Sequence, residues 1–311
     1  MKRIFNILLA FIFVINSQSL DQTLAQTAES AKNGSADSAA AGSSRKADSS
    51  LTLTLPLREN SVRFLAIGDT GRGNREQHEL ARVMVEYRRL FPYEFVIMTG
   101  DNIYGKQTAE DLKLKFEDVY KTLLDQDVKF YASLGNHDDS NQRFYKYFNM
   151  NGQEYYRIQK RDVSFYALNS VYLDERQLKW MEKEFAKDTA KWKIAFFHHP
   201  PYSSGKRHGS AEEIRKIVEP IFIKHGVDVV FTGHDHFYER IKPQKGIHYF
   251  VTGAGGKIRS GDIKKKSPLT ESGFDRDLSF MLIEISEDEM HFQSISRTGA
   301  TVDSGVIRRP D

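Results

Sequence analysis

The stretch "YEFVIMTGDNIYG", residues 93–105, decides the fold because it joins a strand to a polar turn in one unit. Its first half is a short run of β-branched and aromatic residues, which is typical of a strand buried on both faces. The run ends at Gly100, and Asp101, Asn102 and Tyr104 follow closely. Asp and Asn are ordinary turn formers, so they alone would indicate only a loop. Tyr104 is the unexpected member, because a phenol so close to the Asp101 carboxylate could share a ligand set with it.

The same unit recurs along the chain, each time as an apolar run that ends in a turn carrying Asp, Asn or His. These units are "SVRFLAI" before "GDTGRG", "VKFYASL" before "GNHDD", "WKIAFF" before "HHPPYSSG", and "VDVVF" before "TGHDHFYER". Amphipathic helical patterns lie between them, at residues 77–90, 112–124, 177–185 and 211–225. This alternation predicts βαβ units around a largely parallel sheet, in which ligands collect beyond the carboxyl ends of the strands. We therefore expect the polar turns to converge on one site.

Two further segments predict antiparallel pairing. Residues 155–170, "YYRIQKRDVSFYALNS", have the pattern of a hairpin with its turn at "KRD". The runs "SFMLIEI", "MHFQSIS" and "TVDSGVI", within residues 279–307, predict an antiparallel section at the end of the chain. The sequence therefore predicts an α/β fold with mixed sheets.

The composition limits the kind of protein and the kind of metal site. The chain has 311 residues, a formal charge of +3, 28% charged residues and 40% hydrophobic residues. This is the profile of a soluble globular protein, without a field strong enough to indicate a nucleic-acid partner. There is no cysteine, so disulfides and thiolate metal sites are excluded. Any metal must be held by Asp, Asn, His, Glu or Tyr.

The beginning of the chain differs from the rest. The letters "MKR" and the apolar residues 4–15 predict a secretory signal over residues 1–25, and hence export to a periplasm or out of the cell. Cleavage after Ser19 or after Ala25 fits this pattern, and an uncleaved anchor or a buried N-terminal helix is the alternative. A transmembrane helix needs about 20 apolar residues, so no stable membrane association is expected after cleavage. The Ala/Ser/Gly-rich residues 26–52 predict a disordered low-complexity linker.

The polar residues at the predicted strand ends form a candidate ligand set. They are Asp69, Asp101, Asn136, His198, His234 and His236, with Tyr104 close by. Each one alone is more typical of a turn, a helix cap or a hydrogen-bonded core histidine. Together, buried carboxylates and imidazoles would repel one another and stay unsatisfied without a cation. The set therefore predicts a metal site.

The blocks "GDTG", "GDNIY", "GNHD", "FFHHP" and "GHDH" resemble the five motif blocks of the calcineurin-like metallophosphoesterases. The tyrosine in the second block and "YER" after the last make the chain similar to the purple acid phosphatases, best of all to the small tartrate-resistant type. The resemblance covers about residues 62–256. It implies a metallophosphoesterase domain over residues 53–311, a β-sandwich of two mostly mixed sheets flanked by helices in four αββα layers.

The resemblance also implies a binuclear centre in which Asp101 bridges the metals. One metal would be held by Asp69, Asp101, Tyr104 and His236, and the other by Asp101, Asn136, His198 and His234. The first set offers hard anionic oxygens that suit Fe³⁺, and the second suits a divalent ion, Zn²⁺, Fe²⁺ or Mn²⁺. A phenol of pKa about 10 ionises near neutrality only beside a strong Lewis acid, so Tyr104 favours iron.

Other histidines are assigned by the same resemblance. His198 is taken as the ligand because in this family the ligand precedes an x-Pro step, and His199 is then a supporting or structural residue. His137 and His208 are expected to face the substrate, where they orient the phosphate and protonate the leaving oxygen. The alternative for His208 is a solvated loop residue.

Some features predict no chemistry of their own. "TGAGGK", residues 252–257, lacks the spacing of a P-loop and is expected to be a loop bordering the site. "GDTGRG" lacks the spacing of a dinucleotide fingerprint. "KKK", residues 264–266, is expected to be a solvated loop. His248 and His291 lie outside the blocks and are expected to be structural.

These observations predict an exported acid phosphatase that hydrolyses small phosphate monoesters through attack of a metal-bound hydroxide, with His137 or His208 as general acid. The first alternative is a phosphodiesterase or nucleotide pyrophosphatase of the same superfamily. Many such relatives carry Asp-x-His in the first block, whereas this chain has Gly71 in that place. The second alternative is a non-catalytic exported metal-binding protein, which the complete ligand set disfavours.

Overall fold

The computed structural model describes residues 51–309. The described residues belong to one unit, Ser49–Asp311. The predicted signal over residues 1–25, and the predicted linker as far as residue 50, lie outside the described residues.

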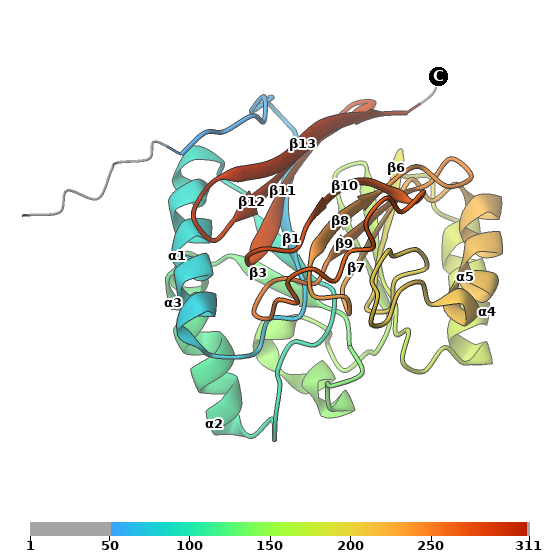
Figure 1. The fold of residues 1–311 in the computed structure, drawn as a ribbon. Helices are drawn as coiled ribbons and strands as arrows, with labels where there is room; N and C mark the ends of the chain where they lie inside the picture. The colour runs from blue at the N-terminus through green and yellow to red at the C-terminus, as the bar shows by residue number, and fades with distance from the viewer. Residues whose placement is uncertain (1–50, 310–311) are drawn as a thin grey trace, which may run out of the picture. The chain divides into compact units, whose positions relative to one another are not determined.

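Two β-sheets form the centre of this unit (Figure 1). The first has six strands in the order β13-β12-β11-β1-β2-β3. Its strands are β1 (Val62–Ile67), β2 (Phe95–Met98), β3 (Lys129–Ala132), β11 (Ser279–Ser286), β12 (Glu289–Ser296) and β13 (Thr301–Arg308). Strands β1, β2 and β3 are parallel, whereas β11 pairs antiparallel with β1, with Ile283 opposite Phe64. The predicted antiparallel section at the end of the chain is confirmed as β11, β12 and β13.

The second sheet has seven strands in the order β10-β8-β9-β7-β6-β5-β4. Its strands are β4 (Tyr156–Lys160), β5 (Val163–Ala167), β6 (Trp192–Phe196), β7 (Val229–Thr232), β8 (Tyr238–Ile241), β9 (His248–Thr252) and β10 (Thr270–Phe274). The predicted hairpin is confirmed as β4 and β5, with Lys160 opposite Val163 at its turn. Strands β5, β6, β7 and β9 are parallel, whereas β4 pairs antiparallel with β5, and β8 pairs antiparallel with both β9 and β10, so this sheet is mixed as well.

Helices cover the outer faces of the two sheets. They are α1 (Arg75–Leu90), α2 (Ala109–Leu112), α3 (Asp118–Asp125), α4 (Glu175–Ala186) and α5 (Glu212–His225), with a π-helical turn, Lys113–Glu117, between α2 and α3, and the 3-10 turns Ser140–Phe144 and Lys146–Phe148. Asn74 and Asp174 cap α1 and α4 by accepting from backbone N–H groups of the first turn, which lowers the cost of starting each helix. The predicted helical ranges are confirmed. None of the helices in residues 51–309 has the length and apolarity needed to cross a membrane.

Figure 1 shows α1, α2 and α3 on one side of the sheets and α4 and α5 on the other. On the first side, the Tyr87 ring of α1 lies 6.2 Å from the Phe280 ring of β11. On the second side, the Phe185 ring of α4 stacks on the Tyr166 ring of β5 at 3.9 Å. Both contacts join a helix to the outer face of a sheet.

An aromatic core lies between the sheets. Phe64 and Phe95 of the first sheet stack at 5.4 Å, and Phe165 of the second sheet meets them edge-on at 5.0 and 5.3 Å. Phe231 of the second sheet lies 6.0 Å from Phe64. All four rings are fully buried, and each aromatic pair contributes about 0.5–1.5 kcal/mol beyond the area it buries. The layers are therefore helix, sheet, sheet and helix, which confirms the predicted αββα sandwich.

Candidate metal centre

The predicted ligands follow the carboxyl ends of strands in both sheets. Asp69 follows β1, Asp101 follows β2, Asn136 follows β3, His198 follows β6 and His234 follows β7. Three of them have left-handed backbone conformations, with φ of 54° at Asp69, 51° at Asp101 and 69° at His234. A non-glycine residue with positive φ is uncommon and costs about 1–3 kcal/mol, and such residues concentrate at functional sites.

One group of ligand atoms gathers around Asp69. The Tyr104 hydroxyl donates to Asp69 Oδ1 at 3.2 Å and lies 3.4 Å from His236 Nε2. His236 Nε2 is itself 3.3 Å from Asp69 Oδ1. Ligand atoms of Asp69, Asp101 and His236 lie within 4.8 Å of one another, and all three residues are buried. The structure therefore brings together the residues that were predicted to hold the first metal.

A second group gathers around His198. Its Nε2 atom lies 3.0 Å from Asn136 Oδ1, 3.1 Å from His234 Nδ1 and 3.4 Å from Asp101 Oδ1. These are the residues that were predicted to hold the second metal. Asp101 belongs to both groups, and that is the position a bridging carboxylate requires.

The charges of these residues fit a pair of metal ions. Burial, followed by the neighbouring Asp101 charge, raises the pKa of Asp69 well above its usual value, and burial also raises the pKa of Asp101. Burial lowers the pKa of His234 and of His236 to about 2, so both imidazoles are neutral, the form that binds metal. Burial therefore disfavours the two carboxylate anions unless a cation lies beside them.

The Tyr104 phenol is protonated in the protein without metal. Burial raises its pKa far above the ordinary value, and the charges of Asp69 and Asp101 raise it further. Its hydroxyl therefore donates to Asp69 rather than competing with it for a cation. Ionisation of this phenol requires a strong Lewis acid in the same place.

Residues that the sequence analysis left without a role hold the ligands in place. His198 Nδ1 lies 3.0 Å from the Thr99 carbonyl oxygen, which directs Nε2 towards Asn136. Asp138 accepts from the backbone N–H groups of Asn102 at 2.9 Å and Gly135 at 2.9 Å, and so ties the second block to the third. Asp138 belongs to the block "GNHD", so the sequence could have indicated it. Thr99 acts through its backbone carbonyl, which every residue has, so no sequence signal could identify Thr99.

Two glycines allow a close approach of backbone at the site. A Cβ at Gly135 would overlap the amide nitrogen and carboxylate of Asp101, and a Cβ at Gly256 would overlap the carbonyl oxygen of Thr70. Gly256 belongs to "TGAGGK", which therefore packs directly against the first block. This loop borders the site, as predicted.

The remaining predicted histidines lie beside the ligands. The exposed His137 has its ring 5.1 Å from the Tyr104 ring, and its backbone N–H donates to Asp101 Oδ1 at 3.0 Å. The ring of the exposed His208 lies 4.1 Å from the ring of the candidate ligand His234. Both are therefore exposed side chains beside candidate ligands.

His199 is closer to the centre than a purely structural role requires. Its ring lies 4.6 Å from the His234 ring, and its ligand atom is within 4.8 Å of those of His198 and His234. One ring nitrogen, Nδ1, is engaged by Ser170 Oγ at 2.9 Å. His248 lies in β9, and His291 in β12 contacts Glu289 at 3.1 Å, so neither belongs to the centre.

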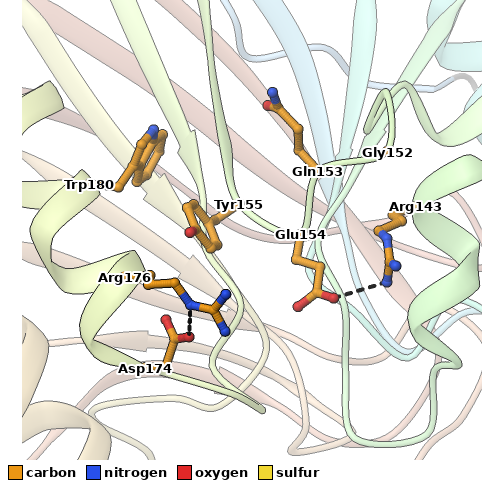
Figure 2. A pocket seen from close by; sticks show the side chains of 8 residues that line it. All are labelled: Arg143, Gly152, Gln153, Glu154, Tyr155, Asp174, Arg176 and Trp180. Atoms are coloured by element: carbon orange, nitrogen blue, oxygen red, sulfur yellow. Dashed lines mark hydrogen bonds and ion pairs between the residues drawn. The ribbon is translucent and has the colours of Figure 1, made fainter.

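A separate cavity of about 430 Å³ contains none of the predicted ligands (Figure 2). Its lining includes an aromatic pair and two ion pairs, namely Tyr155 with Trp180, Arg143 with Glu154 and Arg176 with Asp174. Figure 2 shows each arginine directed at its own carboxylate, and both pairs measure 3.0 Å. The charges of this cavity are therefore balanced within the protein.

The model of the calcineurin-like phosphoesterase family matches residues 62–238, and the chain belongs to this family. Its relatives include purple acid phosphatase 3 of Arabidopsis thaliana, 29% identical over 272 residues, which cover 75% of this chain and 74% of the relative. They also include tartrate-resistant acid phosphatase type 5 of Oryctolagus cuniculus, 28% identical over 250 residues, which cover 66% of this chain and 77% of the relative. The predicted resemblance is confirmed.

Solved structures share the fold. The Plasmodium protein GAP50, described as the anchor in the inner membrane complex, superposes with a TM-score of 0.71 at 19% identity, covering 81% of this chain and 90% of its own. The purple acid phosphatase PPD1 of yellow lupin superposes with a TM-score of 0.64 at 16% identity over 81% of this chain, which spans 54% of the lupin enzyme. The family and the purple acid phosphatase relatives imply a binuclear metal centre, for which the two groups of residues above are the candidate ligands.

Proposed function

We propose that this protein is a metal-dependent phosphatase that hydrolyses small phosphate monoesters at acid pH. The observation that carries the proposal is the Tyr104 hydroxyl, which lies 3.2 Å from Asp69 and 3.4 Å from His236 at the first ligand group. A phenol in this place distinguishes a purple acid phosphatase centre from a general two-metal phosphoesterase site. The purple and tartrate-resistant acid phosphatases among the relatives support the same activity.

The ligand chemistry supports different metals in the two groups. Two carboxylates and a phenol favour trivalent iron in the first, whereas an amide, two imidazoles and the shared carboxylate favour a divalent ion, zinc, iron or manganese, in the second. When bound, such a pair supplies Lewis-acid stabilisation and an activated nucleophile for in-line displacement at phosphorus. Because a trivalent ion would lower the pKa of a bound water further than a divalent ion, we expect an acidic optimum.

The protein's own residues bind the ester and move the proton. His137 and His208 lie beside candidate ligands, where each would donate to a phosphate oxygen, and one of them would protonate the leaving oxygen. Asn136 and His198 come from opposite sheets and would hold the second ion between them, so the ester would be oriented between groups of fixed position. No side chain of the centre needs to form a covalent bond to phosphorus.

The test combines a visible spectrum, metal analysis and two substrates. The purified protein should contain iron and show a charge-transfer band that disappears in Tyr104→Phe while the metal content stays the same. Nitrophenyl phosphate should be hydrolysed with a higher kcat/KM than its bis ester. Full metal occupancy without iron or such a band would leave a general metallophosphoesterase. A preference for the bis ester would favour the phosphodiesterase alternative, and metal binding without hydrolysis would favour the non-catalytic one.

We also propose that the chain is exported and acts on small phosphorylated molecules, without nucleic-acid partners or stable membrane association. The basic and apolar residues 1–25 support export, and residues 26–52 would then link the mature end to the folded domain, 53–311. N-terminal sequencing of the protein from extracellular and periplasmic fractions tests this proposal. A mature protein that begins at Met1 and remains inside the cell would contradict it.

A further inference from the structure

The cavity shown in Figure 2 has the size and the lining of a site for a small organic molecule. Its volume is about 430 Å³, within the range of about 300–1,000 Å³ that is usual for ligand sites in proteins. It is built by three segments, namely the 3-10 turn Ser140–Phe144, residues 152–155 and the first half of α4 with its cap Asp174. Ligand sites combine aromatic side chains with a few polar groups, and this cavity has both.

Two aromatic rings form the apolar wall of the cavity. The rings of Tyr155 and Trp180 lie 5.1 Å apart and are tilted by 55°, so they form an open corner rather than a stack. The Trp180 ring also meets the Tyr166 ring of β5 edge-on at 6.2 Å, which fixes its position. Both Tyr155 and Trp180 are only partly buried. The face of an aromatic ring is negative and attracts polarised C–H groups, so this corner suits a ligand with a flat face of C–H groups.

A third aromatic ring lies at the margin of the cavity. Phe144 is 65% exposed and is one of the two most exposed large hydrophobic side chains in residues 51–309. The centre of its ring lies 4.7 Å from Cζ of the lining residue Arg143. Its ring also approaches the lining residue Gly152, where a Cβ would stand 3.1 Å from Phe144 Cε1. Apolar side chains gathered at the surface around a cavity mark a site of interaction.

The polar lining is electrically neutral and offers both donors and acceptors. Arg143 donates to Glu154 at 3.0 Å. Arg176 donates to Asp174 at 3.0 Å, so a charged ligand would have to disturb an existing ion pair. Glu154 Oε2 also accepts from Asn169 Nδ2 at 2.9 Å, which fixes that carboxylate. A guanidinium has several N–H donors and a carboxylate several acceptor positions, so both pairs keep capacity for hydroxyl groups, which donate and accept.

We propose that this cavity is a binding site for an uncharged sugar ring, a hexopyranose. A pyranose has a flat face of C–H groups for the corner of Tyr155 and Trp180, and neighbouring hydroxyls for the two ion pairs. A planar aromatic ligand would match the rings but leave the polar lining without new partners, and an anion would compete with Glu154 and Asp174. The inference goes beyond the proposed phosphatase function, because none of the candidate metal ligands lines this cavity.

The cavity and the metal centre share one loop. Asn169 donates to Glu154 of the cavity, and the next residue, Ser170, has its hydroxyl 2.9 Å from His199 Nδ1. The His199 ring lies 4.6 Å from the ring of the candidate ligand His234. The bound sugar can therefore belong either to the organic part of a phosphate ester or to a separate glycan, and both sources present the same chemistry to the cavity.

Calorimetric titration with unphosphorylated sugars tests the site without relying on turnover. The metal-loaded, full-length protein is titrated with the methyl glycosides of glucose, galactose, mannose and N-acetylglucosamine. At least one should bind with a Kd of about 1 mM or tighter. Tyr155→Ala and Trp180→Ala should each weaken that binding by about tenfold, and Arg176→Gln by about three- to tenfold. The other tryptophan, Trp192, is buried, so a change in fluorescence on binding reports Trp180.

Matched controls separate the cavity from general effects of the substitutions. Arg75→Gln removes an arginine that pairs with a carboxylate at 2.7 Å at the start of α1, as Arg176 does at the start of α4, and should leave the affinity unchanged. Leu114→Ala removes an exposed apolar side chain outside the cavity and should also have no effect. Thermal melting of every variant is measured because Trp180 is partly buried. Tyr155→Ala and Arg176→Gln decide the question if Trp180→Ala does not fold.

A planar ligand tests the chemical class of the occupant. Indole, which has the aromatic face but no hydroxyls, should bind more weakly than the best glycoside. Tighter binding of indole that is lost in Tyr155→Ala would overturn the proposal and assign the cavity to an aromatic ring. No binding of any of these glycosides, or glycoside binding that is unchanged in both Tyr155→Ala and Arg176→Gln, would overturn it as well.

Kinetics identify the source of the sugar. The ratio of kcat/KM for the 6-phosphate of the best-binding hexose to kcat/KM for nitrophenyl phosphate is compared between wild type and Arg176→Gln. A lower ratio in Arg176→Gln supports the site and assigns the sugar to the substrate. An unchanged ratio together with weakened glycoside binding supports the site and assigns the sugar to a separate glycan. Glycoside binding without any hydrolysis would contradict the proposed function and leave the sugar site standing.

Discussion

Backbone strain and side-chain position are linked at the predicted ligands. Asp69 and His234 have φ of 54° and 69°, and the His234 N–H donates to Asp69 Oδ2 at 2.8 Å. The same strained turns that aim the side chains therefore also bind each other across the two sheets. Asp101, with φ of 51°, accepts the His137 N–H at 3.0 Å in a similar way. The cost of each conformation is offset only if these partners are present, so we expect substitutions here to affect binding and folding together.

Asp101 is the residue whose loss should affect both metals. Asp101→Asn replaces the shared anionic oxygen by a neutral amide, so it should reduce occupancy of both sites. The loss of affinity should exceed the roughly 10- to 100-fold typical of a supporting residue. Metal content measured by mass spectrometry checks this, with the exposed Asp127→Asn as control. Complete loss of one ion with full retention of the other would show that Asp101 does not bridge.

The two histidines beside the centre should differ in their dependence on the leaving group. A general acid contributes typically 10²- to 10⁴-fold, but only where the leaving oxygen needs a proton. If His208 is the acid, His208→Gln should lower kcat by about 10²-fold for an alkyl phosphate and far less for nitrophenyl phosphate. His137→Gln should then lower both to the same extent. The reverse pattern would assign the proton transfer to His137, and equal losses in both variants would leave only phosphate binding to them.

At the scale of residues, a role could be predicted from the sequence where a side chain acts directly. Asp69, Asp101 and Tyr104 could be selected because each follows a strand end and has ligand chemistry. The environment of His199 could not, because its contact with Ser170 depends on how β5 and β6 lie next to each other. The same holds for the Thr99 carbonyl, since backbone atoms leave no trace in residue identity.

At the scale of elements, the loop that carries His208 is held by two buried carboxylates of the last motif. Ser203 Oγ donates to Asp235 Oδ2 at 2.5 Å, and the Gly209 N–H donates to the same oxygen at 3.1 Å. Glu239, in β8, accepts from the Ser204 N–H at 2.9 Å. The loop is therefore fixed on both sides of His208, with His234 under the imidazole.

Ser203→Ala should release one side of this loop. A hydrogen bond to a charged acceptor is worth about 1.5–3 kcal/mol. The free energy of unfolding should therefore decrease by about 1.5–3 kcal/mol. Catalysis should fall through misplacement of His208, and the fall should be larger for an alkyl phosphate than for nitrophenyl phosphate. Metal content should stay the same. Ser260→Ala, at an exposed serine of another loop, is the control. A variant that loses metal instead would show that the loop supports the ligands rather than the acid.

The buried Glu239 should make the free energy of unfolding depend on pH. Burial raises its pKa above the ordinary 4.5, so the folded state binds its proton more tightly than the unfolded state. Its contribution to stability is therefore complete below the unfolded pKa and is lost as pH rises through the folded pKa. Glu239→Gln keeps the shape of the protonated form and does not titrate. The unfolding free energy of wild type minus that of the variant should fall as pH rises from about 4.5 towards neutrality.

Urea unfolding at a series of pH values measures this difference, at equal metal loading. Glu271→Gln, at an exposed position in β10, is the control and should show no such trend. A difference for Glu239→Gln that grows with pH would mean that the carboxylate is stabilised as an anion by its hydrogen bonds to Ser204 and Thr270.

Three strands, β8, β9 and β10, were missed in the sequence, and for two of them there is a physical cause. β10 (Thr270–Phe274) is an edge strand with "TESGF" as its sequence, so it lacks the apolar run that buried strands require. β8 (Tyr238–Ile241) begins directly after the last ligand block, and its letters "YER" read as part of a motif. Strands buried on both faces, such as β2 and β7, were recognisable because burial itself demands the apolar run, although β9 (His248–Thr252), which is buried along most of its length, was missed.

At the scale of the whole folded unit, the candidate ligands come from both sheets. The residues that follow β1, β2 and β3 supply Asp69, Asp101, Tyr104 and Asn136, whereas those that follow β6 and β7 supply His198, His234 and His236. The sequence alone could predict that the turns converge, because carboxyl ends of parallel strands share an edge. The sequence could not predict which turn belongs to which sheet, because this depends on pairings between strands far apart in the chain, such as β1 with β11.

Because the candidate ligands come from both sheets, metal removal should affect stability. The Phe64, Phe95, Phe165 and Phe231 core joins the sheets without metal, so chelation should leave the protein folded. Ligands that bind only the folded state nevertheless stabilise it, by about 2.7 kcal/mol when their concentration is 100 times Kd. For a unit of this size, chelation should lower Tm by about 5–10 °C.

Asp101→Asn should melt near the chelated wild type and should not respond to chelator, because both ions depend on Asp101. Calorimetry of the two proteins with and without chelator measures this directly. An equal response in Asp101→Asn, or no response in wild type after verified loss of metal, would show that the centre does not link the sheets.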